Sequence, residues 1–174
     1  MEKVKKLPGK INFFNFAKKE VKINGDYKIS DLSRLSEIAS NKNDNLEVGL
    51  SFHLENGKIP CVEGIIKLKL VLDCQRCLDN LDLNLKVTFD IAFVRNELHA
   101  DSIDDKFEVC LIGEDEELDT KDLITDEILL SIPMAPSHDF ECGFKTDKED
   151  IVDEVREHPF DALKNIKIAN FGKE

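Results

Sequence analysis

The sequence predicts an α+β protein: an antiparallel β-sheet with a Cys-x-x-Cys hairpin, and two to three helices that lie mostly toward the C-terminus. Apolar residues recur at every second position in residues 46–54, 61–72 and 81–94, as they do in half-buried strands. Only short turns separate these segments, and parallel neighbours would need long crossovers, so we expect an antiparallel meander that can curl strongly. The two-residue period outnumbers the helical patterns, which gather late in the chain.

The N-terminal part of the chain predicts one short strand and one short helix. Residues 11–16 are rich in phenylalanine next to lysine-rich segments and predict a strand whose rings enter a core. Residues 31–39 predict a helix with apolar side chains on one face, which Ser30 or Asp31 can cap. A further short strand is expected at residues 107–111.

Helical patterns follow the strands. Residues 118–132 predict a helix with a broad apolar stripe, capped by Asp119 and stopped by the prolines that follow. Two more short helices are expected in residues 146–168, the second of which opens at a proline. We expect a single domain over residues 1–174, with an acidic loop and helix region at 96–132.

Negative charge is concentrated in one part of the chain, and this bears on the kind of partner. The formal net charge is −12. Residues 96–127 hold 13 acidic residues against Lys106 and Lys121, whereas residues 1–95 carry a net charge of +3. Nucleic-acid affinity comes largely from basic residues, so the acidic segment favours a basic protein partner such as a ribosomal protein. The alternative is a solvated acidic loop.

Composition favours a cytoplasmic protein without a membrane span. No stretch reaches the roughly 18 apolar residues of a membrane helix, and the charged N-terminus has no apolar signal segment. Five cysteines are an odd number, which suits a reducing compartment better than a set of disulfides. The chain has no Gly-rich phosphate loop, nucleophile elbow or His-Glu-x-x-His pattern, so we expect neither an enzyme nor a small-molecule substrate.

Cys74 and Cys77 lie between the second and third long strands, in the sequence Cys-Gln-Arg-Cys. A turn between strands can bring two thiols to one point, as in zinc knuckles. A redox Cys-x-x-Cys instead opens a helix, whose N-terminus lowers the thiol pKa. The residues after Cys77 keep the two-residue period. They favour the metal-type turn over a thiol-disulfide redox protein, which is the alternative from another functional class.

Three separated motifs resemble those of one bacterial family. They are Cys74-Gln-Arg-Cys77 between long alternating strands, the segment from Leu123 to Pro136 after an acidic stretch, and the segment from Pro159 to Ile166. In this order, over roughly residues 45–166, they are similar to the YceD family, also called large ribosomal RNA subunit accumulation proteins. Three motifs in order are far more specific than Cys-x-x-Cys alone.

The resemblance implies a non-catalytic factor that supports synthesis, processing or stability of large-subunit (23S) ribosomal RNA. The implied partner is the large-subunit rRNA precursor, a basic ribosomal protein, or both. An acidic adaptor that holds a basic ribosomal protein before assembly is a further alternative. Many family members have a second Cys-x-x-Cys late in the chain, where this sequence has only Cys142 with His138 four residues earlier.

Cys74, Cys77, His138 and Cys142 are the candidate metal ligands. Thiolates and an imidazole suit tetrahedral zinc, and two separated ligand pairs are the usual construction of a structural site. Such a Cys₃His centre would fasten the loop after Pro136 to the sheet. The alternative is a pair of reduced thiols beside a hairpin, without metal.

Gln75 and Arg76, at the tip of the hairpin, are the candidate contacts for RNA or a partner protein. A forked and permanently charged arginine suits phosphates or stacked bases, and glutamine can read base edges. Lys67, Lys69 and Lys86 are expected on the polar faces of the adjoining strands, as further contacts of the same kind.

Overall fold

The computed structural model describes residues 7–96, 103–112 and 117–143, all within one compact unit, Met1–Gly143. Within it, strands and helices combine in one α+β fold, as the sequence predicts. Among the described helices, none has the length and apolar character that a membrane span requires. A single domain over residues 1–174 stays a prediction.

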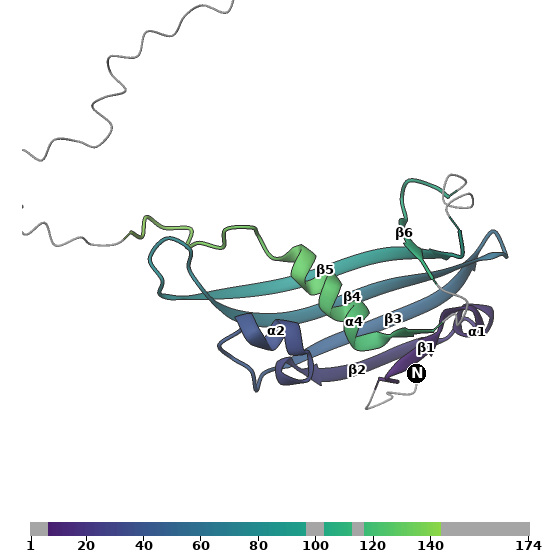
Figure 1. Ribbon diagram of the computed structural model, residues 1–174, viewed down its shortest axis with the longest axis horizontal. Helices are drawn as coiled ribbons and strands as arrows, with labels where there is room; N and C mark the ends of the chain where they lie inside the picture. The colour runs from purple at the N-terminus through teal and green to yellow at the C-terminus, as the bar shows by residue number, and fades with distance from the viewer. Residues whose placement is uncertain (1–6, 97–102, 113–116, 144–174) are drawn as a thin grey trace, which may run out of the picture. The chain divides into compact units, whose positions relative to one another are not determined.

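A five-stranded sheet forms the body of this unit, in the strand order β2-β3-β4-β5-β6 (Figure 1). Its strands are β2 (Lys22–Lys28), β3 (Asn45–Glu55), β4 (Ile59–Asp73), β5 (Asn80–Val94) and β6 (Glu108–Leu111). Neighbours are antiparallel except β5 and β6, which run parallel. The predicted meander is confirmed as β3, β4 and β5, and the short strand expected at residues 107–111 is confirmed as β6.

Helices lie on one face of this sheet, and α4 crosses that face obliquely (Figure 1). The helices are α1 (Phe13–Lys18), α2 (Ser33–Ile38), which follows the 3₁₀ turn η1 (Ile29–Asp31), and α4 (Thr120–Ser131). A separate two-stranded sheet pairs β1 (Lys10–Asn12) with β7 (Glu117–Asp119) in antiparallel order. It ties the start of the chain to the entry of α4.

The core lies between the sheet and these helices because alternate strand residues point toward them. Ile66 and Leu70 of β4 are fully buried, and so are Ile124 and Ile128 of α4, all in one cluster. On the opposite face of the same strand, Ile65 is 47% exposed. Alternation along β4 therefore decides which side chains leave water, and the polar face of its central part stays solvated.

Gly64 in β4 gives room to an aromatic ring in β5. It pairs with Phe89 in the strand register. A Cβ atom at Gly64 would lie 1.9 Å from Cζ of Phe89, so only glycine leaves the ring in place. This close fit helps to fix the register of the long hairpin that carries the Cys-x-x-Cys turn.

The strand predicted at residues 11–16 is wrong for most of its length. Only β1 is extended, and the chain then turns into α1, because the Asn12 side chain accepts a hydrogen bond from the Asn15 N–H at 2.9 Å. Phe13 is fully buried in α1, with its ring centroid 3.9 Å from that of Phe93. A short aromatic cluster has no period that separates helix from strand, so the cap decides.

The cap predicted for the helix at residues 31–39 is also wrong. The N-cap of α2 is Leu32, which makes no side-chain hydrogen bond there. The Asp31 carboxylate instead accepts from the Lys28 N–H at 3.2 Å, one turn earlier, and closes η1. The strand β2 was not predicted, since residues 22–28 are mostly polar and show little apolar alternation.

The helix predicted at residues 118–132 is confirmed as α4. Its N-cap is Asp119, whose carboxylate accepts a hydrogen bond from the Lys121 N–H at 2.7 Å, as expected. The acidic region expected at 96–132 is described only in part, and the helical segment expected at 146–168 lies outside the described residues.

Candidate metal centre

The two cysteines lie in the turn that joins β4 to β5. The strands pair up to Asp73 and Asn80, and the Cys74 N–H then donates to the Asp79 carbonyl at 2.9 Å. The Leu78 N–H donates back to the Cys74 carbonyl at 2.9 Å, with Leu78 in the left-handed region at a φ of 64°. The prediction of a turn between strands is confirmed, and these thiols are not at the start of a helix.

Three hydrogen bonds to backbone carbonyls fasten the loop after α4 to this turn. The Gln75 N–H donates to the Pro136 carbonyl at 2.8 Å. Nη2 of Arg76 donates to the carbonyls of His138 and Phe140, at 2.6 and 2.7 Å. The forked guanidinium suits this task because it can direct several N–H groups at once. The loop is thereby held with its own side chains facing the cysteines.

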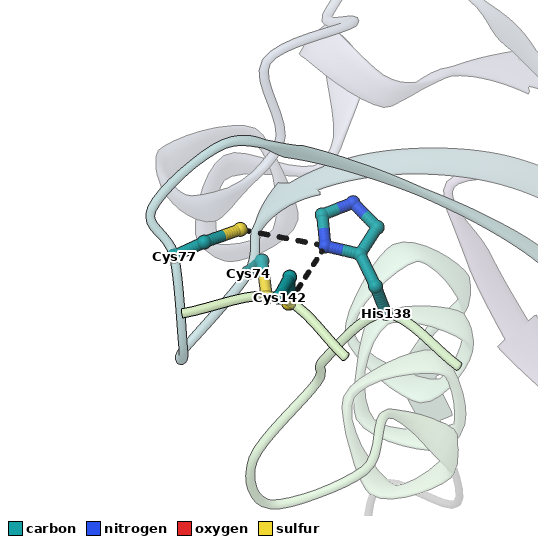
Figure 2. A group of neighbouring side chains, drawn as sticks. All are labelled: Cys74, Cys77, His138 and Cys142. Carbon is teal, nitrogen blue, oxygen red and sulfur yellow. Dashed lines mark hydrogen bonds between the residues drawn. The ribbon is translucent and has the colours of Figure 1, made fainter. Parts of the chain in front are cut away.

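Cys74, Cys77, His138 and Cys142 converge on one point, although more than 60 residues separate the two pairs in the chain (Figure 2). The Sγ atoms of Cys74 and Cys142 lie 3.6 Å apart. Nδ1 of His138 lies 3.5 Å from Sγ of Cys77 and 3.4 Å from Sγ of Cys142. All four ligand atoms lie within 4.8 Å of one another. The four residues predicted as ligands are therefore brought together.

These separations fit a tetrahedral metal ion. With Zn–S bonds of about 2.3 Å and Zn–N bonds of about 2.0 Å, tetrahedral angles place neighbouring ligand atoms about 3.5 to 3.8 Å apart. The three contacts of 3.4 to 3.6 Å among the ligand atoms agree with this geometry. A disulfide would need sulfurs about 2.0 Å apart. The donor set, three sulfurs and one imidazole, is one that zinc prefers.

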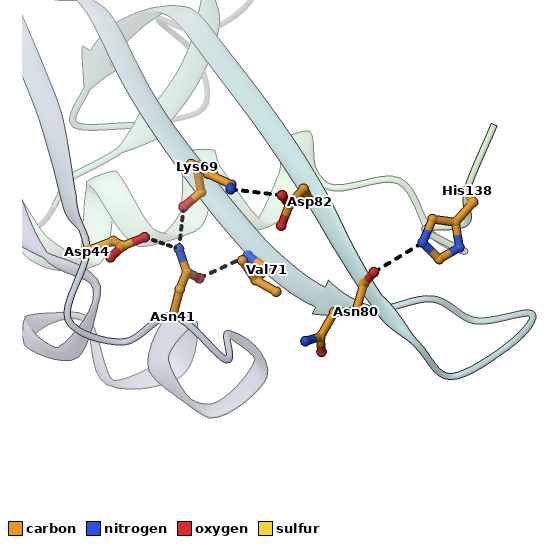
Figure 3. A network of polar contacts seen from close by, with 7 residues as sticks. All are labelled: Asn41, Asp44, Lys69, Val71, Asn80, Asp82 and His138. Atoms are coloured by element: carbon orange, nitrogen blue, oxygen red, sulfur yellow. Dashed lines mark hydrogen bonds and ion pairs between the residues drawn. The ribbon is translucent and has the colours of Figure 1, made fainter. Parts of the chain in front are cut away.

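The orientation of the His138 ring leaves the correct nitrogen free for a metal. Its Nε2 lies 3.1 Å from the Asn80 carbonyl, which can only accept, so Nε2 carries the proton (Figure 3). The Nδ1 lone pair then faces the sulfurs. The Phe140 ring stacks on the imidazole at a centroid distance of 4.7 Å and holds its plane. Such a support of the non-ligating nitrogen is the rule for metal-bound histidines.

The surroundings of the thiols favour one thiolate in the absence of metal. Burial opposes ionisation of Cys74, but backbone N–H groups of Cys77, Arg76 and His138 outweigh it and lower the Cys74 pKa to about 5. For Cys77, the Asp79 N–H lowers the pKa, but burial and the Cys74 and Cys142 sulfurs raise it to about 11.

Contact with the Cys142 sulfur raises the pKa of His138 above its ordinary value, although burial lowers it. The neighbouring Asn80 carbonyl and Cys74 raise it further. Without metal, the cysteine sulfurs and the His138 imidazole share protons, and a metal cation that binds them displaces these protons.

The face of the sheet opposite the helices carries Lys67, Lys69 and Lys86, several residues along the strands from the Cys-x-x-Cys turn. They line one shallow hollow of about 480 Å³ together with polar and apolar residues of three strands, Asn45, Glu47, Leu68, Asn84 and Leu85. Lys67 and Lys86 stand directly opposite each other in the register. Lys69 is engaged with Asp82, with Nζ 2.8 Å from Oδ2. The three lysines predicted as contacts thus share one surface.

Two supports of this region could not be read from the sequence. The Asn41 side chain donates to the Lys69 carbonyl at 2.9 Å and accepts from the Val71 N–H at 2.9 Å, where β4 extends beyond β3 (Figure 3). The Asn80 carbonyl orients His138. Both contacts involve the main chain, so no residue type or spacing signals them in advance.

The fold and the cluster define an α+β protein whose β4–β5 hairpin carries a Cys₃His cluster that could hold a metal ion. The chain belongs to the YceD family: residues 62–167 match the family described as Large ribosomal RNA subunit accumulation protein YceD. The resemblance seen in the three motifs is thereby confirmed.

A curated relative extends the similarity to nearly the whole chain. The Haemophilus influenzae protein named Large ribosomal RNA subunit accumulation protein YceD is 28% identical over 173 residues. The alignment covers 96% of this chain and 99% of the relative. No solved structure matches this chain.

Proposed function

We propose that this protein supports accumulation of the large ribosomal RNA subunit, and that it does so by binding rather than by catalysis. The observation that carries the proposal is the similarity, from end to end, to a relative of that name. A binding role agrees with a convergent cluster of ligand type beside a rigid hairpin. We expect the protein to act in the cytoplasm, where ribosomal subunits of bacteria are assembled.

The Cys₃His cluster is proposed as a structural zinc centre, with Cys74, Cys77, His138 and Cys142 as its ligands. The contact distances and the protonated Nε2 of His138 support a four-coordinate site without an open position. Bound zinc would supply a cross-link between the β4–β5 turn and the loop after α4. A redox role has less support, because the Cys-x-x-Cys lies in a hairpin and two further ligand groups approach it.

The partner is proposed to be a basic ribosomal protein or the large-subunit rRNA precursor, and charge near the centre favours the protein. The Arg76 guanidinium, predicted as an RNA contact, is engaged with two carbonyls of its own chain. Three exposed carboxylate residues lie beside it in the sequence of the turn and loop: Asp79, Asp139 and Glu141. They would repel phosphates and attract lysine and arginine side chains.

Two experiments test this function. Deletion of the gene in its own host should lower large-subunit rRNA relative to small-subunit rRNA, and the wild-type gene should restore the ratio. An unchanged ratio would contradict the role in accumulation. Affinity purification of the protein with and without RNase, probed for both rRNA and ribosomal proteins, distinguishes the partners. Retention of a ribosomal protein after RNase supports the protein partner, and its complete loss supports RNA.

A further inference from the structure

One edge of β5 has no partner strand among the described residues over most of its length. β4 pairs with residues 80–92 of β5 on one side. On the other side β6 pairs only with residues 91–94. Apart from β4, no described segment makes a backbone hydrogen bond with residues 81–90. A long open edge of this kind is a template for another extended chain.

The direction of the open backbone groups follows from contacts at three places. Asn41 and Ser40 make hydrogen bonds with the backbone of Lys69 and Val71 on the β3 side of β4. The backbone N–H and C=O groups of the even-numbered residues of β4 therefore point toward β5. Their partners in β5 are the odd residues, beginning with Leu81. The even residues of β5 therefore direct both N–H and C=O away from β4. The outward carbonyls of Asn80 and Val94 agree, since one accepts from His138 and the other from Ile112.

The open edge is closed at both ends, which makes it a slot of defined length. The slot consists of the outward-facing residues Asp82, Asn84, Lys86, Thr88 and Asp90. At one end His138 donates to the Asn80 carbonyl (Figure 3). At the other end β6 begins opposite Ile91. An extended segment of about nine residues would span it at roughly 3.4 Å per residue.

The helix-covered side of the slot is apolar and incompletely covered. Leu83 and Leu85 point to this side and are only partly buried, whereas Leu81 and Val87 before and after them are buried. Leu130, near the end of α4, is 77% exposed. An added strand would place every second side chain on this side, next to Leu83 and Leu85.

On the other side of the slot, unpaired carboxylates gather only at the end near β6, because Asp82 is already paired with Lys69 at 2.8 Å and Lys86 stands opposite Lys67. At that end Asp90 stands opposite Glu63 of β4, and burial followed by this neighbouring carboxylate raises the pKa of Asp90. Beyond the slot, β6 opens with Glu108, which is exposed and begins to pair opposite Ile91. A strand with lysine or arginine beside Asp90 would complement these carboxylates.

We propose that the slot binds an extended segment of a basic partner protein, in which apolar residues alternate with polar ones and lysine or arginine lies beside Asp90, by addition as a sixth strand along β5. Main-chain hydrogen bonds to the five outward residues provide the affinity, and the leucines on one side and carboxylates on the other provide the selection. The proposal deepens the proposed function by naming how a basic ribosomal protein is held. It rests on that function only for the class of partner.

Residue-resolved amide hydrogen exchange of the full chain, followed by NMR, tests the slot itself. In the free protein the amides of the five slot residues should exchange much faster than those of Leu83, Leu85 and Val87 in the same strand. Slow exchange at both sets would mean that the edge is already paired, which overturns the proposal. Sedimentation at the same concentration then shows whether a second copy of the chain is the occupant.

The partner chemistry is tested with three capped eight-residue peptides: alternating lysine and valine, alternating glutamate and valine, and the lysine peptide N-methylated at every second amide. Only the first should slow exchange at the slot residues and bind in a fluorescence anisotropy titration. Equal binding of the glutamate peptide would overturn the charge selection. Equal binding of the methylated peptide would overturn strand addition.

Two matched asparagine-to-proline variants link binding to the slot. Asn84→Pro removes an outward N–H that β4 does not use, so the β4–β5 pairing should survive. Asn24→Pro makes the same change on β2 at the opposite edge, where Lys28, of the same parity, also directs its N–H outward. Asn84→Pro should lower the affinity for the lysine peptide by about tenfold or more, and Asn24→Pro should lower it by less than about twofold.

The variants also separate this proposal from the role in rRNA accumulation. Retained exchange protection at Leu83 and Leu85 confirms that Asn84→Pro is folded. Unchanged peptide affinity in the folded variant overturns the slot, whatever the deletion strain shows. If the slot binds the peptide but Asn84→Pro restores normal rRNA levels in the deletion strain, the slot holds some other basic protein and its assignment to a ribosomal partner is wrong.

Discussion

Replacing Arg76 by alanine should weaken metal binding although it removes no ligand. The guanidinium holds the backbone of the loop at His138 itself and at Phe140, through two hydrogen bonds of 2.6 and 2.7 Å. A hydrogen bond from a charged donor contributes about 1.5 to 3 kcal/mol where water is excluded. Arg76 is exposed, so we reduce this to about 1 to 2 kcal/mol for the pair. The expected loss of zinc affinity is roughly 5- to 30-fold.

The measurement is a competition titration of the metal-free protein with zinc and a chromogenic chelator. Gln75→Ala is the matched control at the same tip, because the Gln75 contact to the loop is made by its backbone N–H. This variant should bind zinc like the wild type. Arg76→Lys keeps the charge but lacks the fork, so it should resemble Arg76→Ala.

Two results would refute the reasoning. Wild-type affinity in Arg76→Ala would show that the loop needs no clamp. Wild-type affinity in Arg76→Lys alone would show that the positive charge beside the thiolates matters and the two carbonyl contacts do not. Titration with cobalt(II), whose absorption reports tetrahedral thiolate coordination, checks that the geometry of the site is unchanged in each variant.

Three further predictions concern the centre and the sheet. Cys142→Ser should reduce zinc released after thiol modification from one equivalent to nearly none, whereas Cys110→Ser, outside the cluster, should retain it. Gly64→Ala should lower the free energy of unfolding by about 2 to 4 kcal/mol in chemical denaturation, because the added methyl displaces the Phe89 ring, and less so in a Phe89→Ala background. Burial, with nearby carboxylates, raises the pKa of Glu127 to about 7 from 4.5, so stability should fall as pH rises between these values. Glu127→Gln should flatten that fall, and an unchanged pH profile of unfolding would contradict it.

The long strands could be predicted from the sequence because burial on one face imposes a two-residue period. That period is unbroken in residues 81–94, and it also placed the cysteines on a turn rather than at a helix start. It failed for β2, where seven residues contribute only Ile23 and Tyr27 to the core. It failed again at α1, where the hydrogen bond from the Asn15 N–H to the Asn12 side chain starts a helix although the aromatic residues suggest a strand.

The four candidate ligands could be predicted by residue type, because only cysteine and histidine offer soft donors and few of them occur in the chain. The role of Arg76 could not. The sequence shows a charged residue at an exposed tip and suggests an external anion, whereas its partners are two carbonyl groups of the same chain. Main-chain acceptors are the same at every residue, so no pattern of side chains marks them.

The metal centre and the open edge of β5 are joined by a single group, the Asn80 carbonyl. That carbonyl points out of the sheet edge and accepts from Nε2 of His138, the nitrogen that must carry a proton if Nδ1 is to bind zinc. Metal binding therefore fixes the imidazole as the end of the slot. Without metal, the loop would be held only by Arg76 and the Gln75 N–H, and the Asn80 carbonyl would become free to extend the open edge. Exchange at the slot residue nearest that end, Asp82, should consequently depend on zinc, while exchange at Asp90 should not. Equal zinc dependence at both amides would show that the two features are independent.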